Sequence, residues 1–191
     1  MTPTAPSFPA NPQIPVDLFV SRKRRSLIRS GDLIFTNESG SLVFTVDGHS
    51  SNSALPRNEG LLRDAAGNAL ISFSRENNGS WQGFKECQGE DKELLFKVDS
   101  CANKFTRTEL EVFLVGGNRS DSNCSFKMKG CPFQKSCTIY RGNDIVAQTS
   151  LMYKLGRAFI GRCRFRLTIF PGFVDHALVV AMIVIYFDGM K

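Results

Sequence analysis

Hydrophobic and polar residues alternate with a period of two along most of the chain, from about residue 16 to residue 170. Segments such as ALISFSR (69–75), SCTIYR (136–141) and RFRLTIF (164–170) carry an apolar side chain at every second position. This alternation is typical of strands with one buried face. Turn residues separate the segments, as at Asn37-Glu38-Ser39-Gly40 and Ala65-Ala66-Gly67-Asn68. The pattern predicts about eleven or twelve short strands and no long helix before residue 173.

The alternation gives way to a continuous apolar run near the end of the sequence. Residues 173–187 are apolar except for Asp175 and His176, and the uninterrupted part runs from Ala177 to Phe187. A membrane-spanning helix needs about 20 mostly apolar residues. A carboxylate such as that of Asp175 near the membrane centre would cost about 2.5–3.5 kcal/mol. A buried core element is therefore favoured over a membrane anchor.

The length of this run favours a helix, although its many β-branched residues favour a strand. Pro171 and Gly172 form a turn before it, and Asp175 falls where a carboxylate suits the positive end of a helix dipole. Gly189 follows as a C-cap glycine does. We expect a helix over about 173–187. Since it is apolar on every side, it has to be buried on every side.

A closed antiparallel barrel large enough to hold a helix meets this burial requirement and also removes the free strand edges. Phenylalanine is the favoured core residue, with 16 copies against a single tryptophan. The sequence thus predicts a mainly β fold over residues 16–191, in which about twelve antiparallel strands enclose a central hydrophobic C-terminal α-helix.

The first 15 residues have a different composition. Prolines recur there at every third position, at Pro3, Pro6, Pro9, Pro12 and Pro15. In polyproline II geometry these side chains share one face, which suits the groove of an SH3 or WW domain. The other interpretation is a disordered leader that binds nothing. No pattern of a secretory signal peptide is present.

The candidate chemistry is sparse. Without a secretory signal, the six cysteines are expected to be reduced thiols. They form no C-x-x-C pair, and only two histidines accompany them, so neither a metal site nor a cofactor is expected. Catalytic motifs are missing, and Glu109 and Glu111 are interpreted as a solvated strand face. The sequence gives no indication of an enzyme.

Charge is distributed unevenly around a net value of +6. Residues 127–166 contain nine basic groups and a single acid, Asp144, which suggests an anionic partner. Arg162, Arg164 and Arg166 stand at alternate positions, so on a strand their side chains share one face, which we call the arginine stripe. Lys127 and Lys129 alternate in the same way. Two other interpretations of these basic residues remain: a solvated barrel exterior and, for the run at 22–25, a nuclear localisation signal. The candidate residues for binding anionic lipid are Arg162, Arg164, Arg166, Lys127, Lys129, Arg22, Lys23, Arg24 and Arg25.

Several blocks of the sequence resemble the plant LURP-one-related family. They are GDLIFTNESGSLVFTVDGHSS, TELEVFLV, SCTIY with DIVAQ, and FPGFVDHALVVAMIVIYFD, and the resemblance runs from about Val16 to Asp188. It implies a fold similar to the tubby C-terminal domain and to phospholipid scramblases, with twelve strands around a central hydrophobic helix. It also implies a link to basal plant defence. Tubby-like domains bind phosphoinositides and have been proposed as membrane-tethered transcription regulators.

The resemblance does not extend to known lipid or metal ligands. No tubby lipid-binding motif aligns here, and the acidic calcium-binding stretch of scramblases is replaced by the basic segment GRCRFRLTIF. The expectation is a non-enzymatic binding module for anionic membrane lipid, such as a phosphoinositide, in the cytoplasm or at the inner face of the plasma membrane. The alternative is a tubby-like transcription regulator that enters the nucleus and contacts nucleic acid. Phospholipid scrambling is the less favoured third.

Overall fold

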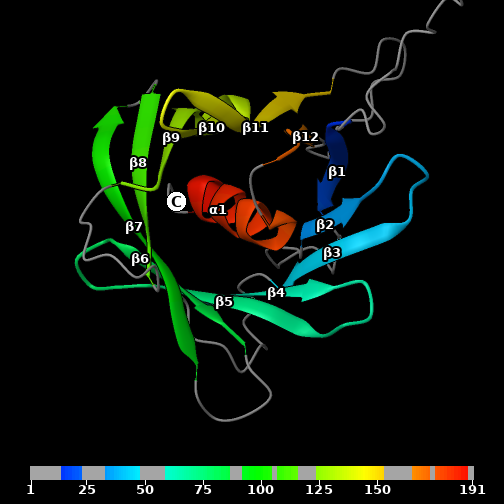
Figure 1. The fold of residues 1–191 in the computed structure, drawn as a ribbon, viewed down its shortest axis with the longest axis horizontal. Helices are drawn as coiled ribbons and strands as arrows, with labels where there is room; N and C mark the ends of the chain where they lie inside the picture. Colours follow the sequence, from blue (N-terminus) through cyan, green and yellow to red (C-terminus); the bar gives the residue numbers. More distant parts are fainter. Residues whose placement is uncertain are drawn as a thin grey trace, which may run out of the picture.

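The structure is a computed structural model that describes residues 14–22, 33–47, 59–86, 92–104, 107–115, 124–152, 165–172 and 175–188. Within these ranges the chain forms twelve strands, one short 3₁₀ helix, η1 (Pro132–Gln134), and one α-helix, α1 (His176–Asp188) (Figure 1). The strands are β1 (Val16–Arg22), β2 (Leu33–Thr36), β3 (Leu42–Asp47), β4 (Glu59–Asp64), β5 (Ala69–Arg75), β6 (Trp81–Lys85), β7 (Glu93–Lys104), β8 (Arg107–Leu114), β9 (Phe126–Cys131), β10 (Ser136–Arg141), β11 (Asp144–Leu151) and β12 (Phe165–Ile169).

The strands form a closed antiparallel barrel in which each strand pairs with its neighbours in sequence. Closure comes from β1 and β12, whose register places Val16 opposite Ile169 and Val20 opposite Phe165. A closed barrel leaves no strand edge to pair with another chain. The predicted mainly β class, the barrel and its strand number are confirmed.

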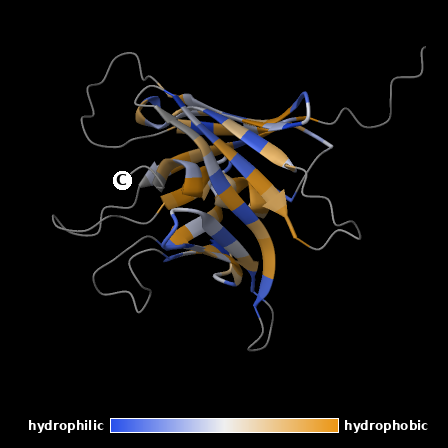
Figure 2. Ribbon diagram, turned by 90° about the vertical axis from the view of Figure 1, so that its left-hand side faces the viewer, coloured by the Kyte–Doolittle hydropathy of each residue, from blue (hydrophilic) through white to orange (hydrophobic). Residues whose placement is uncertain are grey.

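Hydrophobic and hydrophilic residues alternate along the strands (Figure 2). This alternation places the apolar side chains inside the barrel, where most of them are buried. On β5, for example, Ile71 and Phe73 are buried. The ring of Phe73 lies over Gly60 on β4, where any Cβ would clash with it. Strands β5 and β10 have the predicted bounds. Strand β7 is the longest and runs to Lys104, with a register shift between Ser100 and Ala102 that interrupts the alternation.

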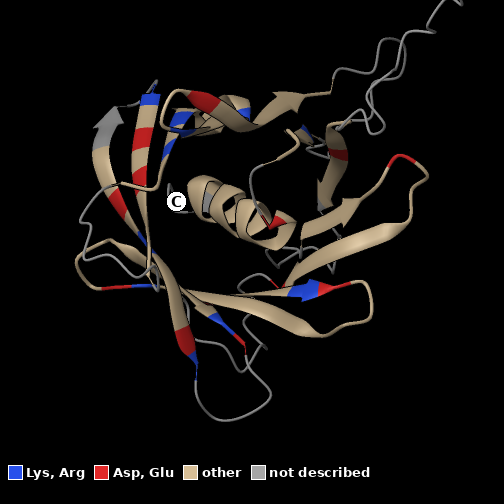
Figure 3. Cartoon of the chain, viewed as in Figure 1, with Lys and Arg blue, Asp and Glu red and all other residues tan. Residues whose placement is uncertain are grey.

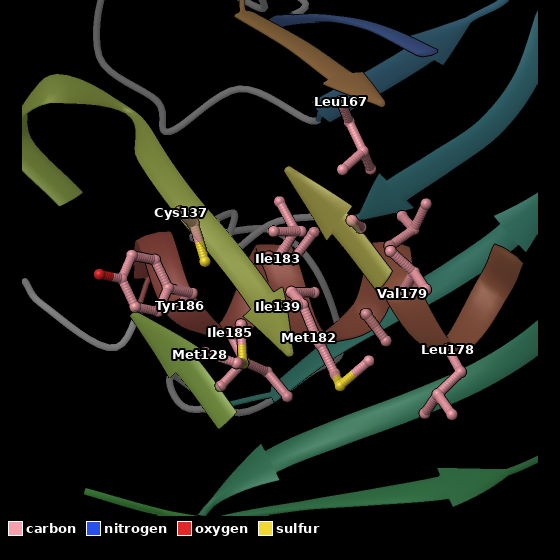
Figure 4. Packing of buried hydrophobic residues seen from close by; sticks show 14 of the residues in the cluster. Met128, Cys137, Ile139, Leu167, Leu178, Val179, Met182, Ile183, Ile185 and Tyr186 are labelled. Carbon is pink, nitrogen blue, oxygen red and sulfur yellow. The ribbon is translucent and has the colours of Figure 1, made fainter. Parts of the chain in front are cut away.

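Helix α1 fills the centre of the barrel, as the sequence predicts (Figure 1). Its side chains from Val179 to Tyr186 are at most 1% exposed. Figure 4 shows Ile183, Met182 and Tyr186 of the helix among barrel side chains such as Ile139 and Cys137. Full burial of an aliphatic side chain contributes about 1.5–3 kcal/mol. The helix is therefore a large part of the hydrophobic core.

The two ends of α1 are held by different hydrogen bonds. The helix begins at His176, and Asp175 stands before it as the N-cap, with its Oδ1 accepting from the Ala177 N–H at 2.9 Å. The predicted start at 173 was thus early, because Asp175 caps the helix and does not form part of its first turn. At the other end the Tyr186 hydroxyl donates to the Thr108 carbonyl on β8 at 3.2 Å. Gly189 lies outside the described residues.

Candidate anion-binding surface

The basic groups at 22–25 and 162–166 are attached to two paired strands, β1 and β12, at the end of the barrel where α1 finishes. Val20 near the end of β1 pairs with Phe165 at the start of β12, and the ring centroids of Phe165 and Phe187 are 5.0 Å apart. The chain leaves β1 at Arg22 and re-enters the barrel at Phe165. Two groups about 140 residues apart in sequence are therefore joined to neighbouring strands at one end.

Most of these basic residues lie outside the described part of the chain. That group comprises Lys23, Arg24, Arg25, Arg162 and Arg164, while Arg22 is described only by its backbone. Their connection to β1 and β12 is fixed by the covalent chain. The candidate binding role of their side chains stays a prediction.

The segments that connect the strands differ in net charge between the two ends of the barrel. At the end where α1 finishes, the connections are 23–32, 48–58, 76–80, 105–106, 132–135 and 152–164. They carry ten basic residues, Lys23, Arg24, Arg25, Arg29, Arg57, Lys135, Lys154, Arg157, Arg162 and Arg164, against the two acids Asp32 and Glu76. We call this the basic end.

The opposite end, at which α1 begins, has the reverse balance. Its connections are 37–41, 65–68, 86–92, 115–125, 142–143 and 170–175. They carry six acids, Glu38, Glu86, Glu90, Asp91, Asp121 and Asp175, against the two basic residues Lys92 and Arg119. We call this the acidic end. The sequences of the connections at the two ends therefore carry opposite net charges.

Arg166 is the one residue of the predicted arginine stripe that the structure describes in full. It lies on the outer face of β12 with 47% of its side chain exposed. Its guanidinium Nη1 is 3.5 Å from Oδ2 of Asp17 on β1. Such an exposed and long ion pair contributes little to stability, so the guanidinium can turn to another anion.

Lys127 and Lys129 lie on the outer face of β9, apart from the arginine stripe. Strands β10 and β11 stand between β9 and β12, so these groups are not neighbours. Lys127 Nζ is 2.9 Å from Glu111 Oε1, and Lys129 Nζ is 3.0 Å from Glu109 Oε1. The hydrogen bond from Lys127 lowers the pKa of Glu111. Figure 3 shows these acidic and basic bands side by side on β8 and β9. Each lysine thus faces a carboxylate, and sequence reasoning did not find these pairs.

A cavity of about 310 Å³ opens at the basic end beside the last turns of α1. Its apolar wall includes Trp81, Leu110 and Tyr186, and Arg75 supplies a cation. Burial raises the pKa of Tyr186, whose hydroxyl stays protonated and donates to Thr108. Sequence reasoning missed this cavity. One signal was available: Arg75 occupies the same phase of the alternation as the buried residues Ile71 and Phe73.

Within the described ranges, no group of three or more His, Cys, Asp or Glu side chains is placed to hold a metal ion. Cys101 on β7 is exposed, but local desolvation and the hydrogen bond with Glu111 raise its pKa to about 11. Burial raises the pKa of Cys137 as well. His176 is exposed at the first position of α1. Cys87 and Cys163 lie outside the described residues. None of the helices in the described ranges has the length and apolar content to cross a membrane.

Comparison with known proteins gives consistent matches over nearly the whole chain. The family model described as LURP-one-related matches residues 16–188. Protein LURP-one-related 7 of Arabidopsis thaliana is 47% identical over 177 residues, which cover 93% of this chain and 91% of that protein. Protein LURP-one-related 15 of the same plant is 29% identical and covers 91% of this chain and 80% of that protein.

A solved structure agrees with the architecture. An X-ray structure of an Arabidopsis thaliana protein superposes with a TM-score of 0.63 at 25% sequence identity. The match covers 92% of this chain and 91% of that one.

Proposed function

This chain belongs to the LURP-one-related family, and we propose that it is a non-enzymatic binding module whose basic end contacts anionic phospholipid at a membrane surface. The observation that supports the proposal is the pairing of β1 with β12, the two strands to which the basic groups at 22–25 and 162–166 are attached. Arg22 and Phe165, where the chain enters and leaves these groups, belong to paired strands at one barrel end. A partner with several phosphates is the chemistry that such a concentration of Lys and Arg suits.

The need to balance the helix dipole does not account for the charge at the basic end. The C-terminus of a helix carries the equivalent of about half a negative charge. The connections at this end carry ten basic residues against two acids, which is far more. A basic residue near an anionic lipid surface is worth about 1 kcal/mol. Several of them together would give a useful membrane affinity at physiological salt.

Vesicle flotation tests the proposal. The probes are phosphatidylcholine vesicles with and without a phosphoinositide, at low and at physiological salt. Wild-type protein is expected to float only with the anionic vesicles and more weakly as salt rises. Replacement of Arg162, Arg164 and Arg166 by alanine removes three charges, at about 3 kcal/mol or roughly a hundredfold in affinity.

The matched control is Lys127→Ala with Lys129→Ala. Both lysines are paired with glutamates, so this variant should bind within about threefold of wild type. Failure of wild type to float at physiological salt would refute the lipid proposal. A loss of vesicle binding in the control variant alone would place the contact on β9. If neither variant changes vesicle binding, the four basic residues at 22–25 are the next to replace.

Nucleic acid is the second polyanion that the four consecutive basic residues at 22–25 suit, as in a tubby-like transcription regulator. A labelled DNA duplex added to the flotation mixture separates the two. If the duplex binds while the vesicles do not, the regulator is the better interpretation. A role in plant defence would then concern what the module regulates, and phospholipid scrambling is not part of the proposal.

A further inference from the structure

The cavity at the basic end is built from four strands and the helix. Its walls come from the turn between β5 and β6, from β7 and β8, and from Ile185 and Tyr186 of α1. Trp81 is only 9% exposed and packs against Phe73, with their ring centroids 6.2 Å apart. A volume of about 310 Å³ falls at the lower end of the range of small-molecule pockets, roughly 300–1,000 Å³. The space suits a single ring or a short chain.

Arg75 brings one positive charge to this apolar space. It is paired with Trp81 across β5 and β6, so the two side chains lie on the same, inward face of the barrel. Arg75 makes no hydrogen bond or ion pair with any residue in the described ranges, whereas Arg63 and Arg166 each meet a carboxylate. A guanidinium without a partner beside an apolar wall is an unused binding group.

The acids near the cavity are directed elsewhere. Asp99 is itself one of the residues that line the cavity. It pairs with Glu111, whose carboxylate meets Lys127 on the outer face, so alternation places the Asp99 side chain on that outer face and leaves its backbone beside the cavity. Glu76 accepts hydrogen bonds from the side chains of Asn78, Ser80 and Gln82. These bonds also hold the turn at 76–80 in place. Among the described lining residues, Arg75 is therefore the charged residue whose side chain is directed inward.

We propose that this cavity is a binding site for a small organic anion, with its carboxylate or phosphate on Arg75 and its apolar body against Trp81 and Tyr186. The charge-assisted contact with Arg75 would supply the selectivity for an anion. The apolar wall would supply the preference for a ring or short chain over an inorganic ion. This site is separate from the lipid contact proposed for the basic connections and does not depend on it.

The competing role for Arg75 is to balance the negative end of the α1 dipole. Two other cations already stand there. Lys135 Nζ is 4.8 Å from the centroid of the Phe187 ring, and Arg107 is near enough to Tyr186 to act against the rise of its pKa. A purely electrostatic role predicts that Arg75→Met lowers stability and that no small anion binds. A binding role predicts little change in stability.

Intrinsic fluorescence provides the test, because Trp81 is the single tryptophan of the protein. The probes are benzoate and phenyl phosphate, with benzamide as the neutral match and benzylammonium as the cationic one. We expect saturable changes in Trp81 fluorescence with the two anions and at least tenfold weaker binding of the other two. This comparison uses only the wild-type protein, so it does not depend on any variant folding.

Arg75→Met should weaken benzoate binding by roughly ten- to a hundredfold, to the level of benzamide. Arg141→Met removes an exposed arginine at the acidic end and should leave binding unchanged. Equal binding of benzoate and benzamide by wild type, or no binding of any probe, would overturn the proposal. Vesicle flotation of Arg75→Met should match wild type, which keeps the failure of this proposal distinct from the failure of the lipid one.

Discussion

The two ends of the barrel make different contacts with helix α1. At the acidic end, Asp175 caps the first turn of α1 with a backbone hydrogen bond of 2.9 Å. At the basic end, Tyr186 reaches β8 with its hydroxyl, and a cavity of about 310 Å³ remains beside it. The start of α1 is therefore held by a backbone cap, whereas the described residues leave a cavity beside its end. The difference teaches that the basic end is where binding is to be sought.

The largest effect is expected from the middle of α1, on which both ends depend. Val180 is fully buried, and Val180→Asp would place a carboxylate without a partner among apolar side chains. The cost is several kcal/mol against a typical total stability of about 5–15 kcal/mol. Circular dichroism should show loss of cooperative melting. If the variant melts cooperatively near the wild-type temperature, the helix does not hold the two ends together.

Intermediate effects are expected from the two anchors of α1. Asp175→Ala removes an N-cap and should cost about 1 kcal/mol. Tyr186→Phe removes one buried hydrogen bond, again about 1 kcal/mol. The anchored residues are 11 positions apart, about 16 Å along the helix, so the double variant should show additive losses.

Chemical denaturation of the four proteins measures this cycle. A coupling of more than about 0.5 kcal/mol would contradict the independence of the two ends. Tyr140→Phe, on β10, is a matched control for the loss of a tyrosine hydroxyl and should change the free energy of unfolding by less than Tyr186→Phe.

The smallest effect concerns the barrel wall near the basic end, where Cys101 stands beside acids. The pKa of Cys101 is raised to about 11, so at pH 8 its thiolate population should be roughly a hundredfold below that of an ordinary thiol. Slow alkylation by iodoacetamide is expected, followed by peptide mapping. Glu111→Gln removes a charge that raises this pKa, so alkylation should become faster, with little change in stability.

Rapid alkylation of Cys101 in wild type at pH 8 would mean that its surroundings are basic like the connections. The outer face of the strands around Cys101 would then not differ in charge from the connections at the basic end. Glu93→Gln on the same strand is a matched control and should leave the rate unchanged.

Local order was readable from the sequence because it depends on near neighbours. Period-two alternation located β5 and β10 to the residue, and the length and uniform apolarity of the last segment identified α1. Strand neighbourhood was harder to obtain. Two strands separate β9 from β12, and Lys127 pairs with Glu111. Both facts depend on the strand order of the barrel, which alternation does not encode.

The candidate binding sites also had one part that the sequence showed and another that required the structure. The basic groups at 22–25 and 162–166 were visible as composition, but their attachment to neighbouring strands follows from the pairing of β1 with β12. Arg75 was passed over because a charged residue at the end of a strand is common at a solvated turn. Its inward direction becomes meaningful only when the wall opposite it, Tyr186 and Leu110, is known.

The order of elements along the chain has a consequence for synthesis on the ribosome. All twelve strands leave the exit tunnel before α1, the element that fills their interior. Until α1 has been made, the nascent chain lacks the helix that fills the barrel core. Strand β1 also remains unpaired with β12, its partner about 150 residues away, until β12 has been made. Pairings over such separations are slow to form and expose apolar surface meanwhile. The barrel therefore reaches its final fold only after α1 has been translated. Chaperones that bind extended apolar strands are expected to bind the chain before that point.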